Sequence, residues 1–228
     1  MNWNLLLFVI FPYVSIVLFV VVTIYRSLFR PFTVSSLSSQ LLERRQLYWG
    51  SIPFHWGIIL ILLLHLLALL FPRGLTLWNS VPVRLYLLEA SGLAMGLWTL
   101  IGLLVLFWRR VVNRRVQAVS TWMDYVVLIF LLLSVVTGVV TAVFFRFGSY
   151  WYTAIFTPYL VSLFTLQPQP GLVAPLPWVV QLHALNVFIL LLIFPFSRMV
   201  HILTYPLGYL LRPWQIVIWA RRRQKPVS

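Results

Sequence analysis

Five long runs of apolar residues, separated by stretches rich in arginine, proline or polar side chains, dominate the pattern of this chain. They cover residues 5–24, 52–71, 85–108, 125–145 and 178–203. Each run has roughly the 20 residues that a helix needs to cross the hydrocarbon core of a bilayer. A backbone in hydrocarbon must satisfy its own hydrogen bonds, so each run is predicted to be an α-helix. The pattern therefore predicts an all-α integral membrane protein, built as a bundle of five transmembrane helices.

Proline marks the ends of the second run and one of the longer connections. We expect Pro53 in the first turn of the second helix and Pro72 at its end. The connection 147–177 is rich in proline, tryptophan and tyrosine. Its stretch 150–156 is typical of an interfacial helix or aromatic belt.

The basic residues fall mostly on one side of the membrane if the five helices alternate in direction. Fourteen lysines and arginines lie on that side, and only Arg73, Arg84 and Arg146 lie on the other. Cytoplasmic loops carry the excess of basic residues, so we expect the N-terminus outside and the C-terminus in the cytoplasm. Residues 1–204 are then the transmembrane domain, and residues 205–228 are a basic cytoplasmic tail.

The composition agrees with a membrane protein and excludes several kinds of site. Hydrophobic residues make up 62% of the chain and charged residues 9%, whereas soluble domains carry about 25% charged residues. The net charge of +14 is explained by membrane orientation and contact with lipid headgroups, so no nucleic-acid partner is expected. The chain has no cysteine, which excludes disulfides, thiolate-bound iron–sulfur clusters and a Cys/His zinc site within it.

All four histidines lie in two of the apolar runs: His55 and His65 in the second, His183 and His201 in the fifth. A polar ring in hydrocarbon needs a partner, so intramembrane histidines are candidates for function. Imidazole is also a common axial ligand of haem iron. Because the two helices run in opposite directions, depth pairs His65 with His183 near the outer face and His55 with His201 near the inner face. The pattern therefore predicts one bis-histidine site in each leaflet.

The spacing of the histidines differs between the two helices. Ten residues separate those of the second run, about 15 Å along a helix, and 18 separate those of the fifth, about 27 Å. A tilt of the fifth helix, a bend at Pro195 or tilted porphyrins would reconcile the two. Histidines that merely hydrogen-bond between helices are an open alternative at this point. Zinc is disfavoured, because no acid or thiol accompanies the histidines.

Three stretches carry a resemblance to a known family: residues 38–44 (SSQLLER), Phe54-His55 with His65 ten residues on, and residues 194–202 (FPFSRMVHI). The third run adds Gly92 to Gly102 ahead of Arg109-Arg110. With these stretches the chain resembles, over nearly its whole length, the gamma subunit of respiratory membrane-bound nitrate reductase. That family is a five-helix dihaem cytochrome b.

The resemblance implies two haem b groups, an outer one on His65 and His183 and an inner one on His55 and His201. These are the pairs that depth also predicts. It implies a multi-pass protein of a prokaryotic cytoplasmic (inner) membrane that anchors an iron–sulfur beta subunit and a molybdenum catalytic alpha subunit on the cytoplasmic side. It also implies that menaquinol or ubiquinol is oxidised near the outer haem and that electrons pass inward through the two haems.

Two other functions compete with this one. Gamma-type domains also occur in sulfur-metabolism membrane complexes, so the same fold would serve a different terminal acceptor. A non-redox scaffold or transporter would use the histidines only to hold helices together. A transporter more often shows broken midplane helices or internal repeats, and neither is evident in the sequence.

Arg198 lies one helical turn before His201 and is a candidate to bind the propionates of the inner haem, because arginine binds carboxylates through two hydrogen bonds. An arginine at a helix end is equally typical of a positive-inside anchor. Arg109 and Arg110 are further candidates for the propionates. Asp124, at the start of the fourth run, is predicted to be a helix N-terminal acid stabilised by the helix dipole.

Arg84 and Glu89 are the candidates for a quinol site. The resembling family has a lysine, associated with quinol binding, where this chain has Arg84. Arginine keeps its proton, so its role would be electrostatic or hydrogen-bonding, unless it is only an interface anchor. Glu89, on the outer half of its helix, would accept a proton from quinol. Gly92-x-x-x-Gly96 predicts close helix packing or room for a porphyrin face.

Overall fold

The computed structural model describes residues 2–30, 42–200 and 202–203, and their regular structure is helical, with no strand. Within these residues, five helices are long and apolar enough to cross a membrane: Trp3–Phe29, Arg45–Leu70, Pro82–Val112, Trp122–Phe144 and Trp178–Phe196. The predicted all-α fold with five such helices is confirmed. His201 and the predicted tail 205–228 lie outside the described residues.

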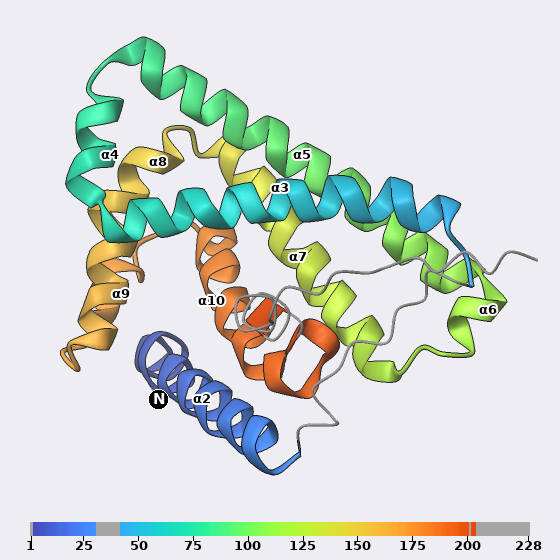
Figure 1. Ribbon diagram of the computed structural model, residues 1–228. Helices are drawn as coiled ribbons and strands as arrows, with labels where there is room; N and C mark the ends of the chain where they lie inside the picture. The colour runs from blue at the N-terminus through green and yellow to red at the C-terminus, as the bar shows by residue number, and fades with distance from the viewer. Residues whose placement is uncertain (1, 31–41, 201, 204–228) are drawn as a thin grey trace, which may run out of the picture.

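The first long helix runs without a break through α1 (Trp3–Leu5), the π-helical η1 (Leu6–Ile10) and α2 (Phe11–Phe29). The others are α3 (Arg45–Leu70), α5 (Pro82–Val112), α7 (Trp122–Phe144) and α10 (Trp178–Ile193). The shorter elements are α4 (Pro72–Asn79), α6 (Arg114–Gln117), α8 (Gly148–Trp151), η3 (Tyr152–Phe156), α9 (Thr157–Phe164), η4 (Pro170–Leu172), η5 (Phe194–Phe196) and η6 (Arg198–Val200). Figure 1 shows α4, α8 and α9 gathered at one end of α3 and α6 at its other end.

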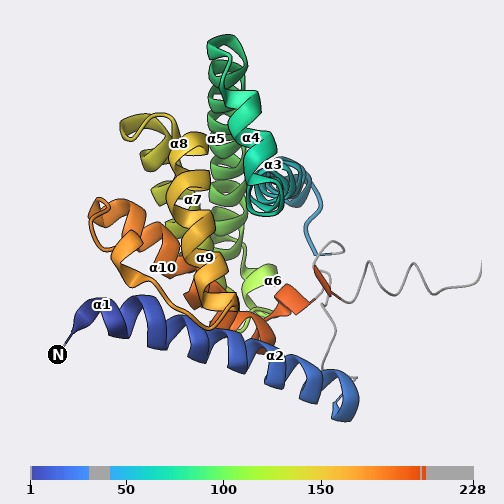
Figure 2. The ribbon, with the colours of Figure 1, turned by 90° about the vertical axis from the view of Figure 1, so that its left-hand side faces the viewer.

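The long helices pack in the order α3, α5, α7, α10 and α2, each mainly on the next. Figure 2 shows α3, seen end-on, at one side of this arrangement and α2 along its bottom. Glycine permits the closest of the contacts, between α3 and α5. A Cβ atom on Gly57 would lie 2.1 Å from Thr99 Oγ1, and one on Gly102 would lie 2.5 Å from the backbone nitrogen of Phe54.

The Gly92-x-x-x-Gly96 pair contributes to packing at only one of its two glycines. A Cβ atom on Gly96 would approach Val139 of α7 to 3.2 Å, which is a close contact. Nothing lies within 4 Å of a Cβ atom on Gly92. Close helix packing is therefore observed at Gly96 but not at Gly92, and the tighter crossing uses glycines that the motif did not include.

Replacing Gly102 with alanine is expected to lower the free energy of unfolding by about 1–3 kcal/mol relative to Gly92→Ala. The new methyl group meets the backbone of Phe54, which cannot move aside as a side chain can. Both variants gain the same helix propensity, so their difference isolates the clash. The measurement is a denaturant titration of the purified protein in detergent. Equal stability of the two variants would contradict the close approach of α3 and α5.

Helix α3 starts at Arg45, well before the predicted start at Ile52, so the expectation that Pro53 lies in the first turn is wrong. Glu43 explains the earlier start. Its carboxylate accepts hydrogen bonds from the backbone N–H groups of Gln46 (2.7 Å) and Leu47 (3.1 Å), which have no partner inside the helix. Pro72 does follow the end of α3, and it also begins α4, a helix that the apolar pattern did not predict.

The fifth helix is shorter than predicted. It keeps α-helical geometry only to Ile193, not to Leu203, and continues as the 3₁₀ turn η5, an extended Ser197 and a second 3₁₀ turn, η6. Pro195 accounts for the break, because proline lacks a backbone N–H and clashes with the preceding turn. Arg26 of α2 donates a hydrogen bond to the Pro195 carbonyl. The chain thus leaves its helical path at the residue where a bend was expected.

The segment that follows α7 is helical, as expected for residues 150–156, and extends further, through α8, η3 and α9. Its anchor is Tyr159, which is fully buried and donates a hydrogen bond to the Phe8 carbonyl at 2.9 Å. Burial raises the pKa of Tyr159, so the phenol stays a donor. A second hydrogen bond, from the Tyr13 hydroxyl to the Leu163 carbonyl at 3.0 Å, joins the same two segments. These bonds tie α9 to the first long helix.

Candidate functional site

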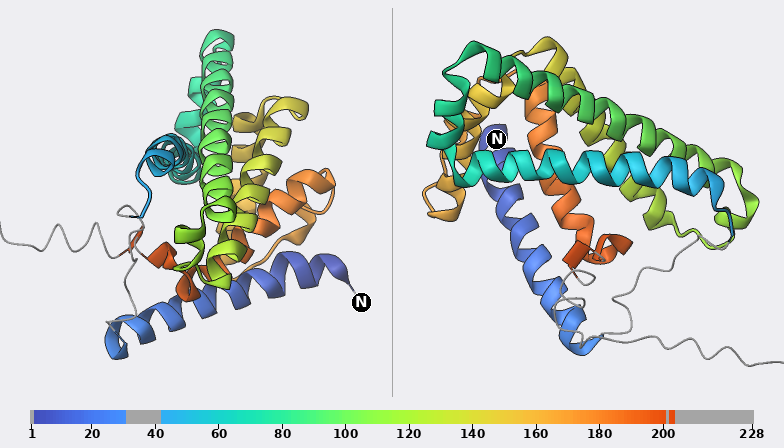
Figure 3. Two further views of the ribbon diagram at one scale, coloured as in Figure 1. Left: turned by 90° about the vertical axis from the view of Figure 1, so that its right-hand side faces the viewer. Right: turned by 45° about the horizontal axis from the view of Figure 1, so that its top comes forward.

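His65 on α3 and His183 on α10 are brought together by the fold. Their helices do not pack extensively against each other, because α5 and α7 come between them in the packing order. Figure 3 shows the arrangement from two further sides. The two rings are nevertheless close enough to interact electrostatically. They are the pair that depth predicted for the outer site, although 118 residues separate them in the sequence.

The ring of His65 is held in one tautomer by its own helix. Its Nδ1 atom lies 2.8 Å from the carbonyl oxygen of Ile61, one turn earlier. A carbonyl only accepts, so Nδ1 carries the proton and Nε2 keeps its lone pair. The ring packs edge-on against Tyr152, with centroids 5.2 Å apart and an interplanar angle of 89°. The side chain is otherwise exposed, so Nε2 is available for coordination.

The ring of His183 lies against α7. Its Nδ1 atom is 3.0 Å from Thr137 Oγ1. A Cβ atom on Gly138 would lie 3.0 Å from the ring atom Cε1, so the ring could not approach a larger residue in this way. One turn along α10, the fully buried Asn186 donates to the Phe130 carbonyl at 2.8 Å. Both contacts fix the face that α10 presents to α7.

His55 repeats the arrangement seen at His65 near the other end of α3. Its Nδ1 atom lies 2.8 Å from the Ser51 carbonyl oxygen and 3.0 Å from Ser51 Oγ. The Phe54 ring packs edge-on at 5.1 Å. Its predicted partner, His201, lies outside the described residues, so only one half of the inner pair can be described.

The hydrogen bonding of the three described histidines suits the role of axial ligands to a haem. Each has its Nδ1 atom hydrogen-bonded to a carbonyl or hydroxyl oxygen, the arrangement that orients metal-binding histidines in proteins. Among the described residues, no three His, Cys, Asp or Glu side chains gather in a cluster. Two imidazoles without a carboxylate match the axial pair of a b-type haem better than the four ligands of zinc.

Arg84 and Glu89, the candidates for the quinol site, do not form an ion pair within the described part of the chain. The Arg84 guanidinium lies over the Trp78 ring, 5.4 Å from its centroid, and its Nε atom is buried without a hydrogen-bond partner. Glu89 Oε1 accepts from both the backbone N–H (2.9 Å) and the hydroxyl (2.5 Å) of Ser149. Asn79 donates to the same hydroxyl at 3.1 Å. Glu89 therefore holds the start of α8, a contact that no sequence pattern indicated.

Asp124 has the predicted place in the first turn of its helix, where it forms a capping box with Thr121. It also joins two arginines, with Arg110 at 2.9 Å and Arg198 at 3.3 Å. Arg198 donates in addition to the Val119 carbonyl at 3.0 Å. These contacts connect η6 to the start of α7. Binding of haem propionates by Arg198 or Arg110 stays a prediction.

Arg109, the third propionate candidate, is buried in an ion pair with Glu43. It is 3% exposed, its Nε atom lies 2.8 Å from Glu43 Oε2, and it also donates to the Glu43 carbonyl at 2.9 Å. Partial desolvation raises the pKa of Glu43, but hydrogen bonds from Gln46, Arg109 and Leu47 outweigh it and hold the pKa below its usual 4.5. The pair fixes the entry to α3 against the end of α5.

Comparison with known proteins gives the same family over most of the chain. Residues 4–220 match the family described as Nitrate reductase gamma subunit. The nitrate reductase gamma chain of Bacillus subtilis is 29% identical over 217 residues, covering 93% of this chain and 96% of that protein. The respiratory nitrate reductase 2 gamma chain of Escherichia coli is 31% identical over 220 residues, covering 94% and 96%. The Hdr-like menaquinol oxidoreductase cytochrome b-like subunit of Archaeoglobus profundus is 27% identical over 194 residues, covering 79% and 54%. On the match over nearly its whole length and on the five apolar helices, this chain belongs to the nitrate reductase gamma subunit family.

Proposed function

We propose that this chain is the membrane-anchoring dihaem cytochrome b subunit of a respiratory nitrate reductase. In this role it oxidises menaquinol or ubiquinol at its outer end and delivers electrons to an iron–sulfur beta subunit on the cytoplasmic side, which serves a molybdenum alpha subunit. The observation that carries the proposal is that His65 and His183 each hydrogen-bond through Nδ1 to an oxygen atom, which keeps the Nε2 lone pair for a metal. Family membership supports it independently.

The proposed ligands are His65 and His183 for the outer haem and His55 and His201 for the inner one. When bound, a b-type haem accepts and releases single electrons. The chain orients the imidazole rings: the carbonyls of Ile61 and Ser51 accept hydrogen bonds from Nδ1–H of His65 and His55. It also contributes an apolar setting, with the Tyr152 and Phe54 rings packed edge-on against these imidazoles.

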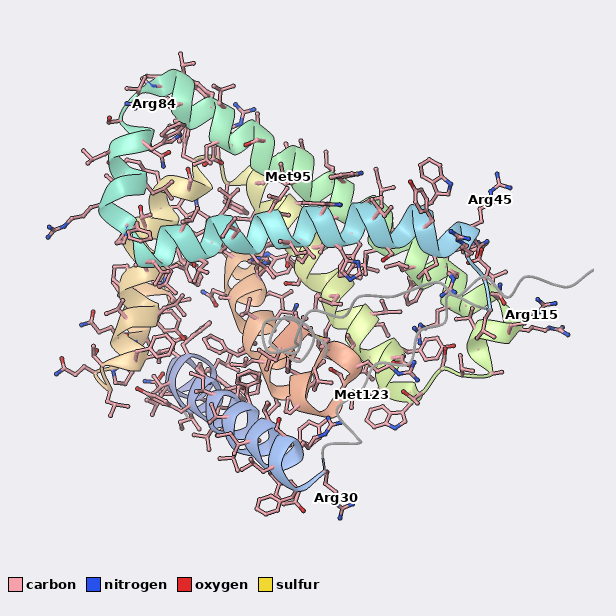
Figure 4. All side chains as sticks on the ribbon, in the orientation of Figure 1. Arg30, Arg45, Arg84, Met95, Arg115 and Met123 are labelled. Atoms are coloured by element: carbon pink, nitrogen blue, oxygen red, sulfur yellow. The ribbon has the colours of Figure 1, made fainter. Side chains whose placement is uncertain are left out.

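The proposed orientation has the N-terminus outside and the C-terminus in the cytoplasm of a prokaryotic inner membrane. Figure 4 supports it, because Arg45 and Arg115 lie at one end of the molecule and Arg84 lies at the opposite end. Cytoplasmic ends of transmembrane helices are rich in arginine. The same basic end would meet lipid headgroups and the partner subunits.

For the quinol site we propose Arg84 as a hydrogen-bond donor to the quinol oxygen. Its buried Nε–H has no partner in the described structure, and a buried donor without a partner is costly. Glu89 is the proposed acceptor of the quinol proton. Because Oε1 already accepts two bonds from Ser149, this role rests on Oε2.

A second candidate function keeps the cytochrome and changes the partner. The alternative is a gamma-type cytochrome b of a sulfur-metabolism complex. That subunits of other complexes can be similar to this chain is seen in the relative from Archaeoglobus profundus, which is named an Hdr-like menaquinol oxidoreductase cytochrome b-like subunit. Purification of the intact complex followed by metal analysis separates the two. Molybdenum together with iron in the partner subunits is expected for a nitrate reductase, and iron without molybdenum would favour the alternative.

The visible spectrum of the purified chain tests the proposed function. We expect a b-type haem band that corresponds to two haems per chain and that is reduced on addition of menaquinol. Protein without this band would overturn both cytochrome functions and would favour a non-redox scaffold or transporter.

A further inference from the structure

A hydrogen bond between neighbouring helices joins Thr137 of α7 to His183 of α10. The distance from Oγ1 to Nδ1 is 3.0 Å, and Thr137 is 5% exposed. The hydroxyl also lies 2.7 Å from the Leu133 carbonyl and 3.0 Å from the Ser134 carbonyl of its own helix. The geometry around this oxygen decides which group donates to which.

A threonine hydroxyl has one proton and two lone pairs. Both carbonyls beside Thr137 can only accept, so the hydroxyl proton points back to α7 and a lone pair faces His183. Nδ1 of His183 must therefore carry the proton, and Nε2 keeps the lone pair that a metal needs.

The two histidines of the outer pair thus reach the same tautomer in different ways. His65 donates to a carbonyl of its own helix, which leaves rotation of the ring to local packing. His183 donates to a hydroxyl on another helix, and Gly138 beside Thr137 allows the ring to lie against α7. Ring orientation at His183 therefore depends on the contact between α7 and α10.

We infer that Thr137 is a positioning residue for the outer haem: its hydroxyl accepts a hydrogen bond from Nδ1–H of His183, fixes the ring and strengthens electron donation from Nε2 to iron. This inference rests on the proposed dihaem function. An acceptor at Nδ1 raises the basicity of a metal-binding imidazole. Stronger donation stabilises oxidised iron, so Thr137 lowers the midpoint potential of the outer haem.

The test compares Thr137→Val, Thr137→Ser and Thr141→Val in the complete complex. Thr141 is the matched control, because its hydroxyl is buried on the same helix without a hydrogen-bond partner among the described residues. In Thr137→Val, the reduction equilibrium of the outer haem should shift roughly tenfold toward the reduced form, which is about +59 mV for one electron. The electron paramagnetic resonance signal of its oxidised form should shift as well. Thr137→Ser should restore both, and Thr141→Val should leave both unchanged.

Each result decides the inference. Loss of the outer haem in Thr137→Val with retention in Thr137→Ser supports it. Loss in both variants would show that only the packing of the threonine matters, and two haems with wild-type potentials in Thr137→Val would show that the hydroxyl does nothing; either result overturns the inference alone. A wild-type chain without haem would overturn the proposed function, and the inference with it.

Discussion

Replacing His183 with alanine is expected to leave one haem per chain instead of two and to abolish quinol oxidation. The outer haem needs both axial imidazoles, so His65→Ala should give the same result, and the double variant should lose no further haem. Such non-additivity is the mark of two residues that serve one site. His55→Ala should instead remove the inner haem, and combined with His65→Ala it should remove both.

The measurement is the haem content of the purified protein together with nitrate reduction driven by quinol. Val187→Ala is the control, because Val187 lies one turn from His183 on α10 and is 50% exposed. It should keep both haems and full activity. Two haems in His183→Ala, or complete haem loss in the His65/His183 double variant, would contradict the ligand pairs.

Replacing Glu43 with alanine is expected to lower the free energy of unfolding by about 3 kcal/mol. The change removes the carboxylate that pairs with the Arg109 guanidinium, which is 3% exposed, and removing one partner of a buried ion pair costs about 3–5 kcal/mol. It also removes the carboxylate that accepts hydrogen bonds from the backbone N–H groups of Gln46 and Leu47 at the start of α3. Arg45→Ala, at an exposed neighbouring position, should change the stability little.

The pH dependence of this effect has a defined sign. The pKa of Glu43 in the folded chain lies below 4.5, so the ionised carboxylate is favoured by folding. Its contribution is complete at pH values above the unfolded pKa and is lost as the pH falls through the folded pKa. Denaturant titrations should therefore show the difference between wild type and Glu43→Ala shrinking below about pH 4.5. A difference that stays constant or grows on acidification would contradict the role assigned to the pair.

The apolar runs were sufficient to predict the number of long helices, because spanning length is a local property of the sequence. Depth along those runs also predicts that His65 pairs with His183, and this pairing stays a prediction. The break at Pro195 was also predictable, because proline acts on its own backbone. The ends of the helices were predicted less well: α3 starts at a carboxylate cap outside its apolar run, and α4 has no strong apolar pattern.

The partners of the polar side chains could not be predicted in this way. Hydrogen bonds join Glu89 to Ser149 across 60 residues of sequence and Arg109 to Glu43 across 66. Another joins Thr137 to His183 across 46 residues. Each pair depends on how far one helix is rotated and shifted against the next, which is set by packing at residues such as Gly57, Gly102 and Gly138. The sequence by itself determined the helices long and apolar enough to span a membrane, the position of each histidine along the chain and the family. Only the tertiary structure decided which groups hold those histidines and which charges are already paired, because side chains on helices meet according to the contacts between helices and not according to their distance along the chain.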